Sequence, residues 1–204
     1  MKRLLMPIGR RITLDEIWRF AKTVHEETLP EDEASSRHLK EKLSHLSLKA
    51  PHRQCSRNRK KETEIGGKCY LVTEGRMGFE TEIKHSNAGL KPLEGITEFT
   101  MRFVPGTCEM KFCQQGKEHK VLIATDGSWR WNRLKLDGRV NSELCLSGYW
   151  EDKNCFVVHA RWVETCYENE LKFCFEKDQV HMSRMNKVGR YMTLQSLTAM
   201  AEKA

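Results

Sequence analysis

The sequence predicts a mainly β fold, an antiparallel meander that forms a barrel or a sandwich, preceded by two short α-helices. From residue 68 onward, apolar residues alternate with polar ones at the period of a β-strand. Turn signals such as Asp126-Gly127 and Asp137-Gly138 separate the alternating runs. Since no helical pattern interrupts residues 68–185, the sequence excludes βαβ units and favours strands joined in succession.

The same patterns divide the chain into four parts. Residues 1–50 form a helical lead-in, 51–67 a basic linker, 68–185 the antiparallel β-barrel domain, and 186–204 a tail or short helix. The lead-in should contain helices over residues 13–29 and 31–48, where apolar residues recur at helical spacing. Because one face of the first helix, with Ile17 and Trp18, is apolar, we expect the lead-in to self-associate or fold back.

Large apolar side chains lie on one face of several predicted strands. Phe79, Thr81 and Ile83 alternate in an early run, and later runs carry more aromatic residues. A closed meander directs one face of every strand into its interior, so these aromatic residues should line or fill a barrel. If the interior binds a small ligand, the candidate binding residues are Phe99, Phe103, Trp150, Phe156, Trp162 and Phe173.

The net charge of +7 raises the question of nucleic acid binding. The densest basic run, residues 53–61, contains no aromatic residue on which a base could stack. A solvated linker is therefore the preferred interpretation, and a nuclear address or an RNA-binding segment is the alternative. No run of the sequence is long and apolar enough for a membrane helix, and a cytoplasmic location is expected.

The eight cysteines include no Cys-x-x-Cys pair, so the sequence predicts no metal site and no cofactor. His159 and His181 could join Cys155 or Cys166 in space, which the sequence alone does not decide. Without a secretory signal, free thiols are expected rather than disulfides.

Catalytic motifs are missing. None of the eleven serines is followed by lysine at the third position, and Gly-x-Ser-x-Gly does not occur. The carboxylate pairs, such as Glu168 and Glu170, are interpreted as solvated charge in turns. The sequence therefore predicts that this chain alone is not an enzyme.

Two Gly-x-Trp elements, Gly127-Ser128-Trp129 and Gly148-Tyr149-Trp150, match a short pattern of lipocalins. In a lipocalin, such a tryptophan closes one end of the barrel. The pattern has only two fixed residues, so a tryptophan that simply fills a barrel core is the preferred explanation. It nevertheless makes a lipocalin-like barrel, and a lipocalin-like carrier of a small apolar ligand, one of the alternatives.

The order of several motifs resembles the C-terminal region of bacterial serine hydrolases related to class C β-lactamases and penicillin-binding proteins. The matching stretches are Leu29-Pro30-Glu31-Asp32, the leucine-rich residues 39–48, Ile65-Gly66-Gly67-Lys68-Cys69-Tyr70, Gly78-Phe79 and Ser147-Gly148-Tyr149-Trp150-Glu151-Asp152. The family's catalytic Ser-x-x-Lys element is missing, and neither Tyr70 nor Tyr149 supplies its Tyr-x-Asn element. The resemblance thus implies a non-catalytic accessory domain, whose partner is a hydrolase domain outside this chain or a second copy of itself.

Three functions follow as hypotheses. The first is the accessory domain that the resemblance implies. The second is the lipocalin-like carrier, with the six aromatic residues around its ligand. The third is a basic interaction or nucleic-acid-binding module, for which the sequence offers only its charge.

Overall fold

The computed structural model describes residues 3–5, 11–22, 32–46, 49–50, 57–79, 94–137, 142–165, 168–186 and 194–202. The chain divides into two compact units, residues Met1–Lys49 and Ala50–Ala204. Among the described residues, no helix is long and apolar enough to cross a membrane.

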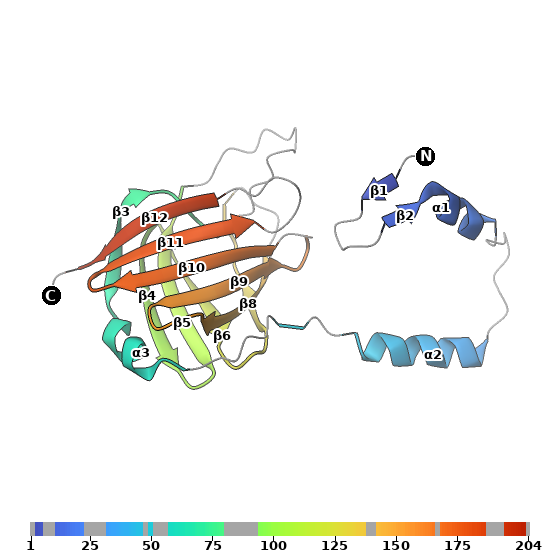
Figure 1. Cartoon of the computed structure of the whole chain (residues 1–204), viewed down its shortest axis with the longest axis horizontal. Coiled ribbons are helices and arrows are strands. Elements are labelled where there is room, and N and C mark those ends of the chain that lie inside the picture. The colour runs from blue at the N-terminus through green and yellow to red at the C-terminus, as the bar shows by residue number, and fades with distance from the viewer. Residues whose placement is uncertain are drawn as a thin grey trace. The chain divides into compact units, whose positions relative to one another are not determined.

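The first unit contains a short hairpin and two helices (Figure 1). Strands β1 (Arg3–Leu5) and β2 (Arg11–Thr13) pair in antiparallel fashion, followed by α1 (Leu14–Ala21) and α2 (Glu33–Ser44). Asp32 caps α2, because its carboxylate accepts hydrogen bonds from the backbone N–H groups of Ala34 and Ser35 at 3.0 and 3.2 Å. The two predicted helices are thus confirmed, with shorter bounds among the described residues. The hairpin was not predicted.

The second unit begins with helix α3 (Arg59–Ile65) and continues into a ten-stranded sheet (Figure 1). The strands are β3 (Cys69–Gly75), β4 (Ile96–Val104), β5 (Thr107–Gln114), β6 (Lys117–Ala124), β7 (Arg130–Arg133), β8 (Glu143–Trp150), β9 (Cys155–Trp162), β10 (Glu168–Glu176), β11 (Gln179–Asn186) and β12 (Leu194–Ala201). Each pairs in antiparallel fashion with its neighbours along the sheet, so the predicted meander is confirmed.

The sheet closes into a barrel at two seams. Strand β3 pairs with β12, and β6 meets β8 through a single parallel bridge from Ala124 to Ser147. Next to this bridge, β7 pairs with β8, while the Asn132 side chain substitutes for the missing ladder toward β6. Its oxygen accepts from the Leu122 N–H at 2.7 Å, and its nitrogen donates to the Leu122 carbonyl at 2.9 Å. The barrel prediction is therefore confirmed.

Buried and more exposed side chains alternate on strands such as β5 and β10, as the sequence indicated, whereas β8 and β9 carry buried side chains on both faces. On β10, for example, Leu171, Phe173 and Phe175 are buried and face the interior, which we call the lumen. Gly148 on β8 also faces the lumen, and an added Cβ would lie 2.7 Å from the Phe156 ring. Glycine at this position lets a ring occupy the space beside the strand. The predicted early run begins at Phe79. Phe79 itself lies in a connection, and the residues of the run after it lie outside the described residues.

The interpretation of residues 186–204 as a tail or short helix is wrong, because residues 194–201 form β12. Leu197 and Ala199 face the lumen, and the strand pairs with β11 on one side and β3 on the other. Short apolar runs fit a helix and a buried strand equally well by pattern. The outcome is decided by the edges of β3 and β11, because a strand between them forms hydrogen bonds with both.

The interpretation of residues 51–67 as a linker is wrong from residue 57 onward, and residues 51–56 lie outside the described residues. Asn58 caps α3 by accepting from the Lys61 N–H at 3.2 Å, and donates to the Lys153 carbonyl at 2.8 Å. Glu62 and Ile65 are buried on the helix face toward the barrel. Because this stretch is rich in basic residues, the sequence pattern did not reveal the inner face formed by Glu62 and Ile65.

The expectation of free thiols is wrong for two cysteines. Cys155 and Cys174 stand directly opposite each other on β9 and β10, 4.2 Å apart between Cα atoms, and form a disulfide. Sequence spacing cannot show this pairing, because it depends on the register of two strands. The described free cysteines are Cys69, Cys108, Cys113 and Cys145.

Candidate ligand-binding site

The lumen near α3 is occupied by a connected group of aromatic rings. Phe103, Trp150 and Phe156 contact one another with centroid distances of 5.2–5.7 Å. Trp150 leads to Phe175 at 6.3 Å, Phe175 to Tyr70 at 5.8 Å, and Tyr70 to Phe99 at 5.3 Å. Phe99 in turn meets Phe173 at 5.9 Å. The structure thus brings together five of the six predicted residues: Phe99, Phe103, Trp150, Phe156 and Phe173.

The sixth predicted residue, Trp162, lies at the other end of β9, which we call the mouth of the barrel. There, residues 76–79, which leave β3, supply two further buried side chains, Met77 and Phe79. The Trp162 indole N–H donates to the Phe79 carbonyl at 3.1 Å, and the Phe79 ring lies 4.8 Å from that of Phe112. Met77 and Phe79 therefore reach the core from a connection, whereas most of its other large side chains come from strands.

Polar side chains gather at this end of the lumen. Gln114, Asn169, Arg184 and Asn186 are all buried at inward positions of β5, β10 and β11. Arg184 is only 3% exposed, and donates at 2.6 Å both to the Gly78 carbonyl and to the Gln195 side-chain oxygen. A guanidinium keeps its positive charge at all relevant pH values. The mouth therefore holds a permanent cation among buried amides, next to the apolar part of the lumen.

One buried polar group lies deeper in the lumen. The Tyr70 hydroxyl is fully buried and forms no hydrogen bond within the described part of the chain. Burial raises its pKa to about 12, assisted by the negative charges of Glu64 and Asp178. The phenol therefore stays protonated, and a polar ligand atom or a water molecule could accept its proton.

An open groove of about 430 Å³ adjoins the connection that occupies the mouth. Val72, Gly75 and Arg76 line one side, and residues 94–97 line the other, where β3 and β4 separate. The Ile96 N–H donates to the Met77 carbonyl at 2.8 Å, so the groove borders the connection directly. The groove therefore lies next to the segment that fills the end of the lumen.

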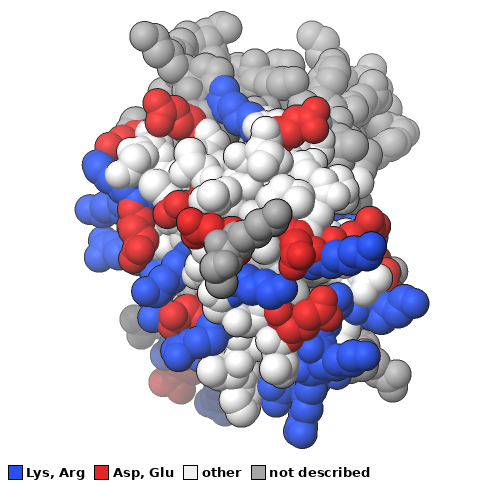
Figure 2. Space-filling model, turned by 90° about the vertical axis from the view of Figure 1, so that its left-hand side faces the viewer, with Lys and Arg blue, Asp and Glu red and all other residues white. Residues whose placement is uncertain are grey.

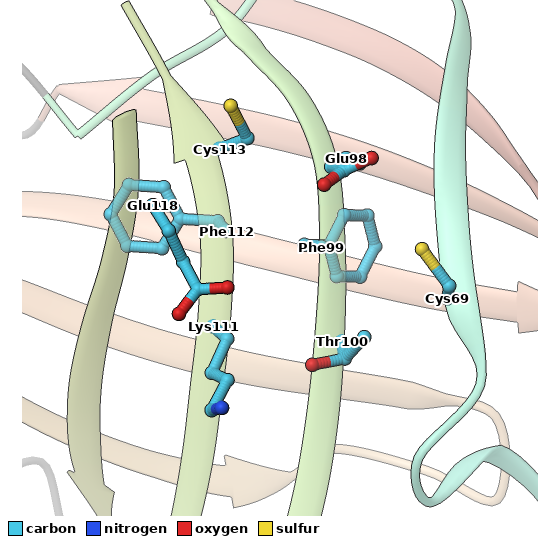
Figure 3. Close-up of a pocket in the computed structure, with 8 residues that line it drawn as sticks. All are labelled: Cys69, Glu98, Phe99, Thr100, Lys111, Phe112, Cys113 and Glu118. Atoms are coloured by element: carbon cyan, nitrogen blue, oxygen red, sulfur yellow. The ribbon is translucent and has the colours of Figure 1, made fainter. Parts of the chain in front are cut away.

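A second hollow, of about 280 Å³, lies on the outer wall of the barrel across β3, β4, β5 and β6 (Figure 3). The thiols of Cys69 and Cys113 stand on different strands, with Glu98 beside them. Burial raises the pKa of the Cys69 thiol, as do the charges of Glu98 and Glu202, which lowers its reactivity. Among the described residues, no group of three or more potential ligands could hold a metal ion.

The glutamates predicted to be solvated charges in turns lie instead on β10, facing outward. Glu168 bonds to His159 Nδ1 at 3.0 Å and to the Arg161 guanidinium. These partners, the histidine first, lower its pKa from 4.5 to about 2, against the opposing effect of burial. The interpretation as solvated charge is wrong for Glu168, because strand register places two basic groups beside it.

Glu168 should make stability depend on pH. Since its folded-state pKa lies below the unfolded value, its contribution is complete above about pH 4.5 and lost as the pH falls toward 2. We expect Glu168→Gln to lower the free energy of unfolding at pH 7 by on the order of 2 kcal/mol. The loss should shrink at pH 3 in urea titrations. The exposed Glu118→Gln serves as the control, and equal pH slopes for both variants would contradict the assignment.

Sequence reasoning missed the residues that make the mouth distinctive, namely Met77, Gln114 and Arg184. A signal for Arg184 exists, because it continues the inward alternation of Val180 and Met182. A charged residue at an apolar position of a strand pattern is an indicator of function. Met77 lies in a connection, so no periodicity could place it in the lumen.

No family model and no curated protein matches the chain. Solved structures match with low identity. Apo lipid binding protein 8 of Caenorhabditis elegans is 15% identical, with 74% of this chain and 100% of that chain covered and a TM-score of 0.49. Secretory abundant heat soluble protein 4 from Ramazzottius varieornatus is 12% identical (70% and 96% covered, TM-score 0.49). A Schistosoma mansoni fatty acid binding protein in complex with arachidonic acid is 10% identical (70% and 98% covered, TM-score 0.47).

The prediction that this chain is an accessory domain of a serine hydrolase is wrong. The reported matches to solved structures include fatty acid binding and transport proteins, and these are covered almost completely by the barrel. The barrel also closes on itself, with its own core, so it needs no second domain to complete the sheet. The motif resemblance to the β-lactamase-like hydrolases is not tested by these matches.

Proposed function

We propose that this chain is a non-catalytic binding protein that carries a small apolar molecule with an acidic group in the mouth half of its barrel. The observation that carries the proposal is Arg184, a permanent cation held inside the lumen beside a segment that can be displaced. Ligand sites are typically apolar with a few convergent polar groups, which describes this end of the barrel.

The ligand needs space that Met77 and Phe79 now fill. These side chains belong to a connection, so their departure breaks hydrogen bonds such as that from the Ile96 N–H to the Met77 carbonyl, but no strand-to-strand ladder of the barrel. The adjoining groove opens at the same place. On binding, the acidic group of the ligand takes the position of the Gly78 carbonyl at Arg184, and its apolar part replaces the two side chains. Of the six predicted aromatic residues, Trp162 then lies beside the ligand, whereas the other five fill the lumen toward α3.

Direct titration with dodecanoate and dodecanol tests this arrangement, with the intrinsic fluorescence of tryptophan as readout. Trp162 donates to the Phe79 carbonyl, so displacement of that segment should change its emission. We expect the acid to bind at least about tenfold more tightly than the alcohol, because a charge-assisted hydrogen bond contributes roughly 1.5–3 kcal/mol. In Arg184→Met this preference should vanish, and in Phe79→Ala both ligands should bind more tightly.

The exposed Arg133→Met is the matched control and should retain the preference. A preference is a ratio measured on the folded fraction, so partial unfolding of Arg184→Met does not imitate the effect. If neither ligand binds even to Phe79→Ala, or if Arg184→Met keeps the preference for the acid, the proposal fails.

The remaining expectations stay predictions. A cytoplasmic location is one of them, although the Cys155–Cys174 disulfide is more typical of an oxidising compartment. Self-association of the lead-in is another. Its basis is now the exposure of Ile17 and Trp18 on α1 and of Leu39, Leu43 and Leu46 on and after α2. A concentration-dependent mass in light scattering would support it.

A further inference from the structure

A second groove lies at the α3 end of the barrel, away from the proposed carrier site. It measures about 430 Å³ and runs between α3 and the end of β4. Three arginines from separate segments line it: Arg57 before α3, Arg59 at its start and Arg102 on β4. Thr63, Gly66, Gly67, Glu62 and Phe103 complete the lining. The groove therefore combines several guanidinium groups with a single carboxylate.

That carboxylate is already engaged. Glu62 is buried, and one of its oxygens accepts from the Trp150 indole N–H at 3.2 Å. The other accepts from the Arg57 guanidinium at 3.1 Å, which balances the charge of Glu62. Arg57 and Glu62 thus form a neutral pair at the edge of the groove, and the remaining arginines determine its charge.

The positive charges of Arg59 and Arg102 are only weakly balanced by nearby carboxylates. Arg102 approaches the Glu109 carboxylate only to 3.9 Å, while Lys120 holds the same carboxylate at 2.6 Å. Arg59 forms no ion pair within the part of the chain that the structure describes. Elsewhere on this side of the molecule, acidic and basic side chains are interspersed (Figure 2). The groove therefore retains an excess of about two positive charges, a local imbalance rather than a general basic surface.

Phe103 adds an aromatic side chain to the lining of the groove and links it to the rings of the lumen. Phe103 is half-buried, lines the groove, and contacts the Trp150 and Phe156 rings at 5.7 and 5.2 Å. At Gly67, an added Cβ would meet nothing within 4 Å, so the backbone there is open to an incoming group. A ligand in this groove would meet two guanidinium groups and the edge of an aromatic ring.

We propose that this groove binds a phosphate monoester through Arg59 and Arg102, with an apolar or aromatic substituent against Phe103. Guanidinium groups pair with phosphate oxygens through parallel hydrogen bonds. A phosphate monoester carries between about 1.5 and 2 negative charges at neutral pH, which matches two weakly compensated arginines, whereas a single carboxylate would leave one unmatched. The phosphate can belong to a soluble molecule or to a lipid headgroup.

The test uses the full-length protein at fixed ionic strength. Phenyl phosphate, benzoate and sulfate are titrated separately, and vesicles with and without phosphatidic acid are tested by sedimentation. Trp150 touches both Phe103 and Glu62, so its fluorescence should report occupation of the groove. Trp150→Phe should remove that signal while calorimetry still detects binding. We expect saturable binding of phenyl phosphate that is at least about tenfold tighter than that of benzoate.

The double variant Arg59→Ala/Arg102→Ala should weaken phenyl phosphate binding by at least about tenfold. The matched control Lys117→Ala/Arg133→Ala removes the same charge elsewhere and should leave binding unchanged. Vesicle binding that depends on phosphatidic acid and on these arginines supports the lipid form of the same chemistry. Equal affinity for sulfate, benzoate and phenyl phosphate, or equal losses in the two double variants, would overturn the proposal.

Discussion

Replacing Phe173 with alanine should lower the free energy of unfolding by about 3–5 kcal/mol, the usual cost of removing a fully buried phenylalanine. The ring lies at the centre of the lumen, where it contacts Phe99. It comes from β10, whose neighbours β9 and β11 hold its backbone on both sides. The surrounding wall therefore cannot collapse into the vacated space, and most of the cavity should persist.

Urea unfolding at neutral pH measures the loss, and benzene or xenon should partly restore the stability of Phe173→Ala by filling the cavity. Trp131→Ala is the control, because Trp131 is 59% exposed and its loss should cost less than about 1 kcal/mol. A cost for Phe173→Ala of the same size as for Trp131→Ala would mean that the lumen is not packed as described.

Replacing Gly75 with alanine should be at least as damaging, with a loss above about 3 kcal/mol from backbone strain and overpacking combined. Gly75 has φ +80°, and an added Cβ would lie 2.4 Å from the Ser196 carbonyl oxygen and 2.8 Å from the Leu197 Cα. Both contacts are with backbone of β12, so no side-chain rotation can relieve them. The substitution therefore acts on the seam that closes the barrel.

Gly116 provides a matched control, because its φ is +67° but an added Cβ meets nothing within 4 Å. Gly116→Ala should cost only the strain of the left-handed backbone, about 1–2 kcal/mol. Thermal unfolding of both variants separates strain from steric overlap. Equal losses for the two would show that the close approach of β3 to β12 does not constrain residue 75.

The sequence was informative wherever one face of a strand is apolar. Strands such as β5 and β10 follow from their alternation alone, because a period of two leaves only one inward set. It was uninformative where the decisive contacts are distant in sequence. Residues 194–201 form a strand because they pair with β3. The Cys155–Cys174 disulfide forms because the register of β9 and β10 places the two cysteines opposite each other.

The candidate site shows the same division. The aromatic wall was predictable, because Phe99 and Phe173 belong to alternating runs. The features that distinguish the mouth were not predictable, because residues 76–79 show no helix or strand periodicity. Their position depends on hydrogen bonds from Trp162 and Arg184. Of the arginines that line the groove beside α3, Arg57 and Arg59 belong to the basic run seen in the sequence. Arg102 could not be grouped with them, since it comes from a separate strand.

The seam between β3 and β12 also bears on how the barrel is made. Tyr70 pairs with Ala201, so the first and last strands of the barrel must find each other across nearly the whole domain. During synthesis, β3 emerges first, and its outer edge waits without a partner until β12 has left the ribosome. Contacts so distant in sequence make closure slow. A nascent chain of this protein therefore exposes an unpaired strand edge for most of its synthesis, which is when a chaperone would matter most.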